Sequence, residues 1–507
     1  MSVLKKLASE TATYGVSTML GRLLNYLLVI LHTQLFRPEQ LSVQVQLYAY
    51  AGLSLVIYTF GMETAYFRFA SKEADRQRYY NVILSAVILV SVFFSGLMFV
   101  FAEQVAEFIQ YPEDVILVRW MSIIMATDGI VSIPFARLRL EKKGRKFVVA
   151  RVANILINIG LNIFFLVICR DIYQEKYLTS LKPAIDLFYD PAIAPGYIIL
   201  ANLIANLAFF WLLRREFLDF RFVFSFEIFK PVWVYAFPIL IMNLAAVTNY
   251  LFDRMALQYL LPEGFYAGRT TKEAIGIYGQ CFKLSIFMNL AIQAFKYAAE
   301  PFFFSKAEDK NAPPVFAEVM KWFIIICVVM WVGICLNLDL LAELFLRKEI
   351  YHEGLNVVPW LLLGFLFLGI YYNLAAWFKL TDKTQYGTYI TITGAASTAA
   401  LNFFLVPELG YLGCAIAFAG SGFLMMSLCY YFGQKFYPVP YQVGSAIGYI
   451  VAAGALIYGS SLFTISNLWI AVPYHMLLFA VFMVGAILVE KDSLPLRFRR
   501  MLGSRAD

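Results

Sequence analysis

The sequence predicts an all-α integral membrane protein with about 14 transmembrane helices. Of its 507 residues, 61% are hydrophobic and only 15% are charged, and the mean hydropathy is +0.70. Long, continuous apolar runs produce these values, which exclude a soluble domain of this length. The runs do not alternate between apolar and polar residues, so the sequence also excludes a transmembrane barrel of β-strands.

Fourteen runs are long enough to cross a bilayer, which takes about 20 apolar residues in a helix. They cover residues 12–36, 44–67, 81–102, 115–136, 147–168, 195–213, 231–260, 274–298, 315–338, 355–378, 387–406, 410–433, 444–465 and 468–489.

The orientation of these helices follows from the placement of Lys and Arg, which favour cytoplasmic loops. Of the 41 Lys and Arg residues, 26 lie in loops on one side of the predicted membrane and only nine lie in the opposite loops. The side with the excess includes both termini, which we therefore expect to be cytoplasmic. Because the basic residues sit in one set of loops, the net charge of +7 does not indicate nucleic acid as a partner.

A basic cytoplasmic segment at 214–230 divides the helices into two sets. We expect an N-terminal six-helix lobe (1–213), a C-terminal six-helix lobe (231–433), two additional transmembrane helices (444–489) and a cytoplasmic tail (490–507). The two lobes are expected to enclose a central cavity. The last two helices contain no charge, and they form either an apolar groove for a lipid tail or peripheral spans.

The first predicted helix carries Arg22 near its middle, roughly 15 Å from the cytoplasmic end at 1.5 Å per residue. An arginine at that depth costs several kcal/mol if it faces lipid. We therefore expect Arg22 to line a polar cavity and to bind substrate. The alternative is a structural ion pair with Glu63 or Asp128.

Three further charges lie within the predicted N-terminal spans, where ionisable residues are functional candidates by default. Arg68 lies near the cytoplasmic end of its helix, from which its side chain could reach the inner membrane surface. Glu63 is deeper, and we expect it to bond another helix. Asp128 is either a proton carrier or a structural partner of an arginine, so all three are assigned to coupling or structure.

The fifth predicted helix carries Arg151, Asn154, Asn158 and Asn162 at spacings of three and four, which place them on one face. A face headed by a basic residue favours cavity lining, and we assign Arg151, Asn154 and Asn158 to substrate binding. The alternative is hydrogen bonding between packed helices, which is common for Asn in membranes.

The seventh and eighth predicted helices carry the remaining candidates. Asn249 and Arg254 are expected to bind substrate, and Asp253 is assigned to coupling or structure. Asp253 and Arg254 point about 100° apart and need not pair, so one could hold a neighbouring helix while the other faces the cavity. Lys283 and Lys296 complete the substrate set, and Pro301 is expected to end or bend the eighth helix.

The candidate charges within or at the ends of the predicted spans thus comprise six basic and three acidic residues, a balance that favours an anionic passenger such as a phosphate or pyrophosphate. The sequence has no GxxxxGK[ST] loop, no HExxH and no GxSxG, so we expect no ATP hydrolysis, no metal site and no enzymatic activity. No cofactor is expected apart from a possible coupling ion, H⁺ or Na⁺.

The chain resembles the oligosaccharide flippases of the multidrug/oligosaccharidyl-lipid/polysaccharide exporter superfamily. The matching segments are LGRLLNYLL, GMETAYFRF, FPILIMNLAAVTNYLFDR, GIYGQCFKLS, QAFKYAAEP and GYLGCAIAFA, in this order. The resemblance implies two six-helix lobes with alternating access to a central cavity. It also implies translocation of an undecaprenyl-pyrophosphate-linked oligosaccharide across the bacterial cytoplasmic membrane, with a polymerase or glycosyltransferases as further partners.

Two other transport functions remain open at the level of sequence. A lipid II flippase shares the implied fold, although its first helix is richer in arginine than the apolar Leu27–Leu31 stretch here. A cation-coupled exporter of small amphiphiles would use Asp128 as its cation site. The excess of basic residues among the candidate charges argues against this function. A membrane-embedded polymerase or ligase is disfavoured because the longest outer loop, 170–195, is short.

Overall fold

The computed structural model describes Leu24 and residues 26–71, 76–306, 312–463, 465 and 467–491. In these ranges the chain forms helices and contains no strand. Twelve of the described helices are long and apolar enough to cross a membrane, and a bent pair makes a thirteenth. These thirteen correspond to the second through fourteenth predicted spans. The first predicted span lies largely outside the described residues, and its end appears as the short helix Tyr26–Leu35.

The first half of the chain contains α2 to α11. Their bounds are α2 Pro38–Thr59, α3 Met62–Phe69, α4 Arg76–Val100, α5 Ala102–Phe108, α6 Val115–Leu140, α7 Gly144–Ile163, α8 Arg170–Tyr173, α9 Lys182–Ile185, α10 Tyr197–Leu212 and α11 Arg214–Leu218.

The second half contains α12 to α22. Their bounds are α12 Phe226–Leu260, α13 Thr271–Leu284, α14 Ile286–Lys306, α15 Ala312–Leu336, α16 Leu338–Phe345, α17 Val358–Leu374, α18 Ala376–Leu380, α19 Gln385–Leu409, α20 Tyr411–Phe436, α21 Val443–Ser461 and α22 Leu468–Val489. A 3₁₀ segment, η6 (Glu349–Val357), leads into α17.

Two predicted spans are broken in ways that the apolar pattern does not reveal. The second is divided into α2 and α3 at Phe60 and Gly61, which adopt φ values of 30° and 74°. A Cβ atom on Gly61 would lie 2.7 Å from the carbonyl oxygen of Ala236, so this break allows α12 to approach closely. The eighth span bends by 43° between α13 and α14, at Ser285, and α14 continues through Pro301 to Lys306. The helix therefore does not end at Pro301.

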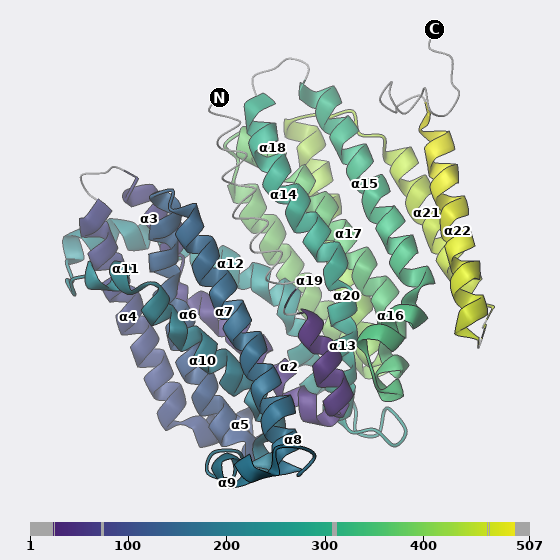
Figure 1. Cartoon of the computed structure of the whole chain (residues 1–507). Coiled ribbons are helices and arrows are strands. Elements are labelled where there is room, and N and C mark those ends of the chain that lie inside the picture. The colour runs from purple at the N-terminus through teal and green to yellow at the C-terminus, as the bar shows by residue number, and fades with distance from the viewer. Residues whose placement is uncertain are drawn as a thin grey trace.

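Figure 1 shows two groups of helices side by side. One contains α4, α6, α7 and α10, and the other contains α14, α15, α17, α19 and α20, with α21 and α22 at its far edge. The long helix α12 connects the groups. Near its start, Val232 and Ala236 are buried in one hydrophobic cluster with Met62 and Tyr66, and its later part packs on α19.

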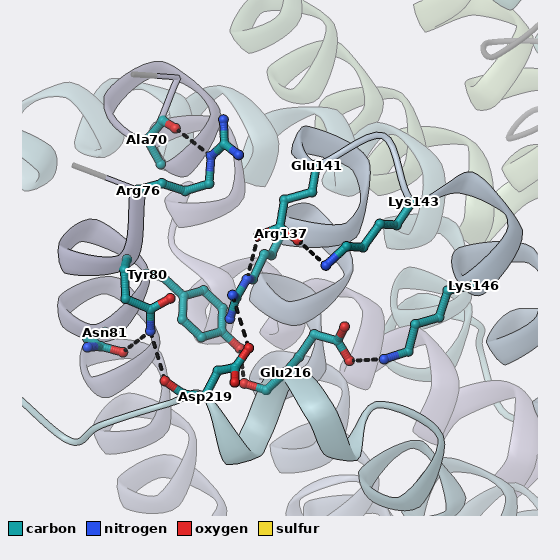
Figure 2. A network of polar contacts seen from close by, with 11 residues as sticks. Ala70, Arg76, Tyr80, Asn81, Arg137, Glu141, Lys143, Lys146, Glu216 and Asp219 are labelled. Atoms are coloured by element: carbon teal, nitrogen blue, oxygen red, sulfur yellow. Dashed lines mark hydrogen bonds and ion pairs between the residues drawn. The ribbon is translucent and has the colours of Figure 1, made fainter. Parts of the chain in front are cut away.

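The end of α6, together with α4 and α11, is held by a network on the predicted cytoplasmic side (Figure 2). The Arg137 guanidinium lies 4.6 Å from the ring centre of Tyr80, and its Nη2 lies 3.2 Å from Asp219 Oδ2. Lys146 at the start of α7 pairs with the buried Glu216 of α11 at 2.5 Å. These contacts fix the ends of four helices in the first group.

Candidate functional site

A cavity of about 450 Å³ lies within the second group of helices. It is lined by α12, α14, α17, α18 and α19, together with Met425 of α20. It extends from Asn249, in the middle of the spanning part of α12, to Lys379 and Thr384 at the predicted cytoplasmic end of the group. In the predicted orientation, the cavity therefore occupies the half of the membrane nearer the cytoplasm.

Three kinds of side chain stand out among the mostly apolar residues of the walls. Amides come from Asn243, Asn249 and Asn373, aromatic rings include those of Tyr371 and Tyr372, and ammonium groups come from Lys296 and Lys379. No carboxylate occurs among the described residues that line it. Aromatic faces and amides suit the two sides of a sugar ring, and lysine suits phosphate or carboxylate.

Two of the predicted substrate residues line this cavity. Lys296 extends from α14, beyond the bend, and its Nζ lies 4.7 Å from the ring centre of Tyr372. Asn249 also bonds α19, because its Oδ1 accepts from Thr398 Oγ1 at 2.8 Å and its Nδ2 donates to the Thr391 carbonyl at 3.3 Å. Asn249 thus fixes α12 against α19 while contributing to the cavity wall.

Asp253 and Arg254 pair with each other, which corrects the expectation that one would face the cavity. Both are buried, and Arg254 Nη1 lies 3.2 Å from Asp253 Oδ1. The Arg254 guanidinium also lies 4.1 Å from the ring centre of Phe282. The second carboxylate oxygen of Asp253 accepts a hydrogen bond from the Tyr278 hydroxyl. The pair joins α12 to α13 and does not contribute to the lining of the cavity.

Lys283 lies at the end of α13, just before the bend. Its Nζ donates to Gln280 Oε1 at 2.9 Å, and its side chain is partly buried. It does not contribute to the cavity lining in the described part of the chain.

The predicted polar face of the fifth span, now α7, is divided between different neighbours. Arg151 lies with its guanidinium 4.0 Å from the ring centre of Phe135. Asn154 Nδ2 donates to the Ala205 carbonyl at 2.7 Å and reaches Asn206 Oδ1 at 3.2 Å, so it ties α7 to α10. Asn158 accepts from Asn162 through both its carbonyl and its side-chain oxygen. Asn154 therefore forms hydrogen bonds between packed helices, which was the alternative to cavity lining.

The charges assigned to coupling or structure have helix-bridging contacts. Glu63 of α3 forms an ion pair with Arg139 of α6, so it bonds another helix as expected. Asp128 Oδ1 accepts from Asn206 Nδ2 at 3.0 Å, so Asp128, Asn206 and Asn154 form a chain of contacts across three helices. Arg68 lies 4.3 Å from the ring centre of Tyr235 and thereby contacts α12. Arg22 lies outside the described residues, and its role stays a prediction.

Several polar contacts that join the two groups were not predicted. On the predicted outer side, Gln46 Nε2 donates to the Arg254 carbonyl at 2.7 Å and Gln258 Nε2 donates to the Ile109 carbonyl at 2.5 Å. Within the first half of the chain, buried His32 meets the equally buried Asn162 at 2.9 Å. For each contact, the sequence showed only a single polar residue in an apolar run, which does not identify the partner. The two glutamine contacts hold the two groups together on the predicted outer side.

The described residues thus contain thirteen candidate spans in two groups, joined by a long bridging helix and enclosing a cavity, which together define a multi-span membrane protein. A model of the polysaccharide biosynthesis protein family matches residues 7–305, more than half of the chain. The chain therefore belongs to this family. No curated protein matched the sequence.

Solved structures support the fold. A lipid II flippase, MurJ, in an inward closed conformation matches with a TM-score of 0.73 and 13% identity, over 95% of this chain and 99% of that one. An inward-facing transporter of the multidrug MATE family matches with a TM-score of 0.59 and 13% identity, over 92% and 97% of the two chains. An outward-facing MATE transporter matches with a TM-score of 0.54 and 12% identity, over 92% of this chain and 100% of that one. The predicted polysaccharide biosynthesis family and the predicted helical fold are confirmed.

Proposed function

We propose that this protein is a flippase that translocates an undecaprenyl-pyrophosphate-linked oligosaccharide across the bacterial cytoplasmic membrane, for the synthesis of a cell-surface polysaccharide. Membership of the polysaccharide biosynthesis family supports the substrate class. The shared fold with a lipid II flippase and multidrug transporters supports movement by alternating access. The cavity of about 450 Å³ is the observation that carries the proposal.

The cavity offers complementary contacts to both polar parts of such a substrate. Tyr371 and Tyr372 provide surfaces for the apolar faces of sugar rings, and the amides of Asn243 and Asn373 suit hydroxyl groups. Lys296 and Lys379 provide ammonium groups for phosphate or for an acidic sugar. The prenyl chain remains in the bilayer, where it costs nothing to desolvate.

Release to the outer side requires the contacts between the two helix groups to open there. Gln46 and Gln258 would exchange their partners on the opposite group for water. Each such hydrogen bond is worth about 1 kcal/mol, so a coupling ion gradient or consumption of the product suffices to drive the change. A polymerase or glycosyltransferases would consume the product, with both termini of the flippase cytoplasmic.

The proposal is tested with purified protein in liposomes that contain a fluorescent prenyl-pyrophosphate oligosaccharide. Accessibility of the inner-leaflet pool to an external reagent measures flipping. Wild type should expose this pool, and Lys296→Ala and Arg22→Ala should slow its exposure about tenfold or more, because each removes a charge-assisted contact. Lys435→Ala, an exposed lysine of the same helix group, is the matched control. Normal flipping by both variants would reject the assigned substrate contacts.

A cation-coupled exporter of small amphiphiles is the second candidate. It is favoured by Asp128, whose carboxylate lies inside the first group and accepts from Asn206. Under this reading Asp128→Asn should abolish ion-driven extrusion of a fluorescent amphiphile while oligosaccharide flipping is absent. Lipid II is included as a third substrate in the same liposomes, so the assay separates all three transport functions.

A further inference from the structure

Four basic side chains belong to three segments that converge on the predicted outer side, where the two helix groups meet. Arg37 directly precedes α2, and Arg170 begins α8, so both belong to the first half of the chain. Arg347 and Lys348 lie in the loop between α16 and η6 of the second half. We call these four residues the outer basic cluster.

Hydrogen bonds fasten the loop to the end of the Tyr26–Leu35 helix. Lys348 Nζ donates to the Leu35 carbonyl at 3.1 Å, and the Tyr351 hydroxyl donates to the Phe36 carbonyl at 3.0 Å. The backbone N–H of Arg347 donates to Thr33 Oγ1 at 3.2 Å. The loop is therefore held next to Arg37.

Helix α8 is anchored through its apolar neighbours. Cys169, next to Arg170, and Ile172 of α8 are buried in the large hydrophobic cluster that also contains Phe36 and Tyr351, and Arg170 lies close enough to Lys348 for the two charges to interact. The outer basic cluster thus rests on buried contacts on both sides of the junction, while Arg37 and Arg347 are exposed.

The cluster holds like charges close together without carboxylate partners. Within the described part of the chain, none of its four members forms an ion pair. Two carboxylates close to it in sequence are engaged elsewhere, since Asp171 bonds Lys176 at 2.8 Å and Glu353 bonds Arg269 at 2.5 Å. Burial, together with Arg37 and Arg170, lowers the pKa of Lys348. An anion placed between these groups would relieve this repulsion.

We propose that the outer basic cluster binds a phosphoester anion that bridges the two helix groups when the outer side is closed. Arginine offers bidentate contacts to phosphate oxygens, and the loop lysine adds a point charge. The anion is either the headgroup of an anionic phospholipid in the outer leaflet or, if the proposed transport function is correct, the pyrophosphate of the carrier lipid as it leaves. Opening the outer side separates the cations and releases the anion.

Binding is measured on the full-length protein without any transport step. Inorganic pyrophosphate is titrated into detergent-solubilised protein, and the rise in thermal unfolding temperature reports its affinity. The double variant R170Q/K348Q should weaken this affinity about tenfold or more, because it removes two charge-assisted contacts. Lys176→Gln, which removes a paired lysine on the same face, is the matched control and should leave the affinity unchanged.

Two further arms identify the source of the anion. If the headgroup is the ligand, moving wild type from phosphatidylcholine nanodiscs to phosphatidylglycerol nanodiscs should raise its unfolding temperature. The same change should raise the unfolding temperature of R170Q/K348Q less. If the carrier is the ligand, undecaprenyl pyrophosphate added to phosphatidylcholine nanodiscs should likewise raise the unfolding temperature of wild type more than that of R170Q/K348Q. A larger rise in unfolding temperature for wild type than for R170Q/K348Q in either arm supports the site. Equal changes for the two proteins in both arms, and with inorganic pyrophosphate, overturn it.

A conservative variant separates charge from structure. Lys348→Arg keeps the positive charge and should retain at least a third of the wild-type affinity, even if the bond to Leu35 is lost. A loss as large as that of the double variant would show that the loop geometry, rather than the cluster, was disturbed, and would also overturn the proposal. Because no step depends on flipping, failure of the liposome assay leaves this result intact.

Discussion

Asp253 and Arg254 are adjacent in α12 and form a buried ion pair, with 3.2 Å between Arg254 Nη1 and Asp253 Oδ1. Successive residues of a helix point about 100° apart, so the pair forms only because the guanidinium curls back toward the carboxylate. It does so while lying against Phe282 and donating to the Tyr250 carbonyl at 2.9 Å. Two charges that sequence analysis treated as separate functional candidates therefore act as one packed unit.

Asp253→Asn should destabilise the protein by about 3–5 kcal/mol, because it leaves the Arg254 guanidinium buried without a counter-charge. The measurement is thermal unfolding in detergent. Asp339→Asn changes an exposed carboxylate in the same half of the chain and serves as the control. If the two variants unfold at the same temperature, the ion pair contributes no net stability.

Gly276 marks a close approach between α13 and the start of α2. A Cβ atom at this position would lie 2.0 Å from the carbonyl oxygen of Pro38, which is backbone and cannot rotate away. Gly276→Ala should cost about 1–3 kcal/mol, as overpacked sites do, and should loosen the outer contact between α13 and α2. Protease sensitivity of the loop after α12 reads out this loosening.

The matched control for Gly276 is Gly96, also within a helix, where a Cβ would meet nothing within 4 Å. Gly96→Ala should be neutral or stabilise by about 0.5–1 kcal/mol, because alanine favours the helix. Equal effects of the two substitutions would show that helix propensity, and not the contact with Pro38, sets the outcome at Gly276.

The apolar runs predicted the helices well because a span must be apolar along its whole length whatever its neighbours are. The partners of polar side chains were much harder to predict. Asn154 bonds α10 and Asn162 meets His32, contacts that depend on which helices pack together. Of the predicted substrate residues that the structure describes, only Asn249 and Lys296 reach the cavity, because periodicity places residues on a face without saying what that face meets.

Glu141 gives a prediction about pH. Burial raises its pKa, but hydrogen bonds from Arg137 at 2.8 Å and from Lys143 at 2.6 Å outweigh burial, so the pKa lies below the ordinary 4.5. A group with a lowered pKa in the folded state stabilises the protein above its ordinary pKa, and this stability disappears as pH falls through the folded value. Glu141→Gln should therefore cost about 1 kcal/mol at neutral pH.

The difference between wild type and Glu141→Gln should shrink as pH falls from neutral through 4.5 and below, because protonation removes the same charge. Unfolding temperatures at a series of pH values test this. Glu227→Gln, an exposed carboxylate on the predicted cytoplasmic side, should show no such convergence. A difference that is constant with pH would mean that Glu141 acts through its shape alone.

The last two helices are attached to the second group through a buried ion pair between Lys321 of α15 and Glu490, which follows α22. Their side chains are each 8% exposed, Lys321 Nζ lies 2.8 Å from Glu490 Oε2, and the Tyr449 hydroxyl of α21 donates to Glu490 Oε1 at 3.2 Å. Removing one partner leaves the other buried without a counter-charge, so Lys321→Met or Glu490→Leu alone should cost about 3–5 kcal/mol.

Lys321→Met combined with Glu490→Leu should recover most of that loss, because apolar residues of similar size replace a buried pair at little cost, and often with a gain of about 1–4 kcal/mol. A double-mutant cycle on thermal unfolding measures the coupling. If the two single losses simply add, the residues stabilise the protein independently. If the double variant recovers, the pair is not needed for stability, and its charges instead specify which helices α21 and α22 contact.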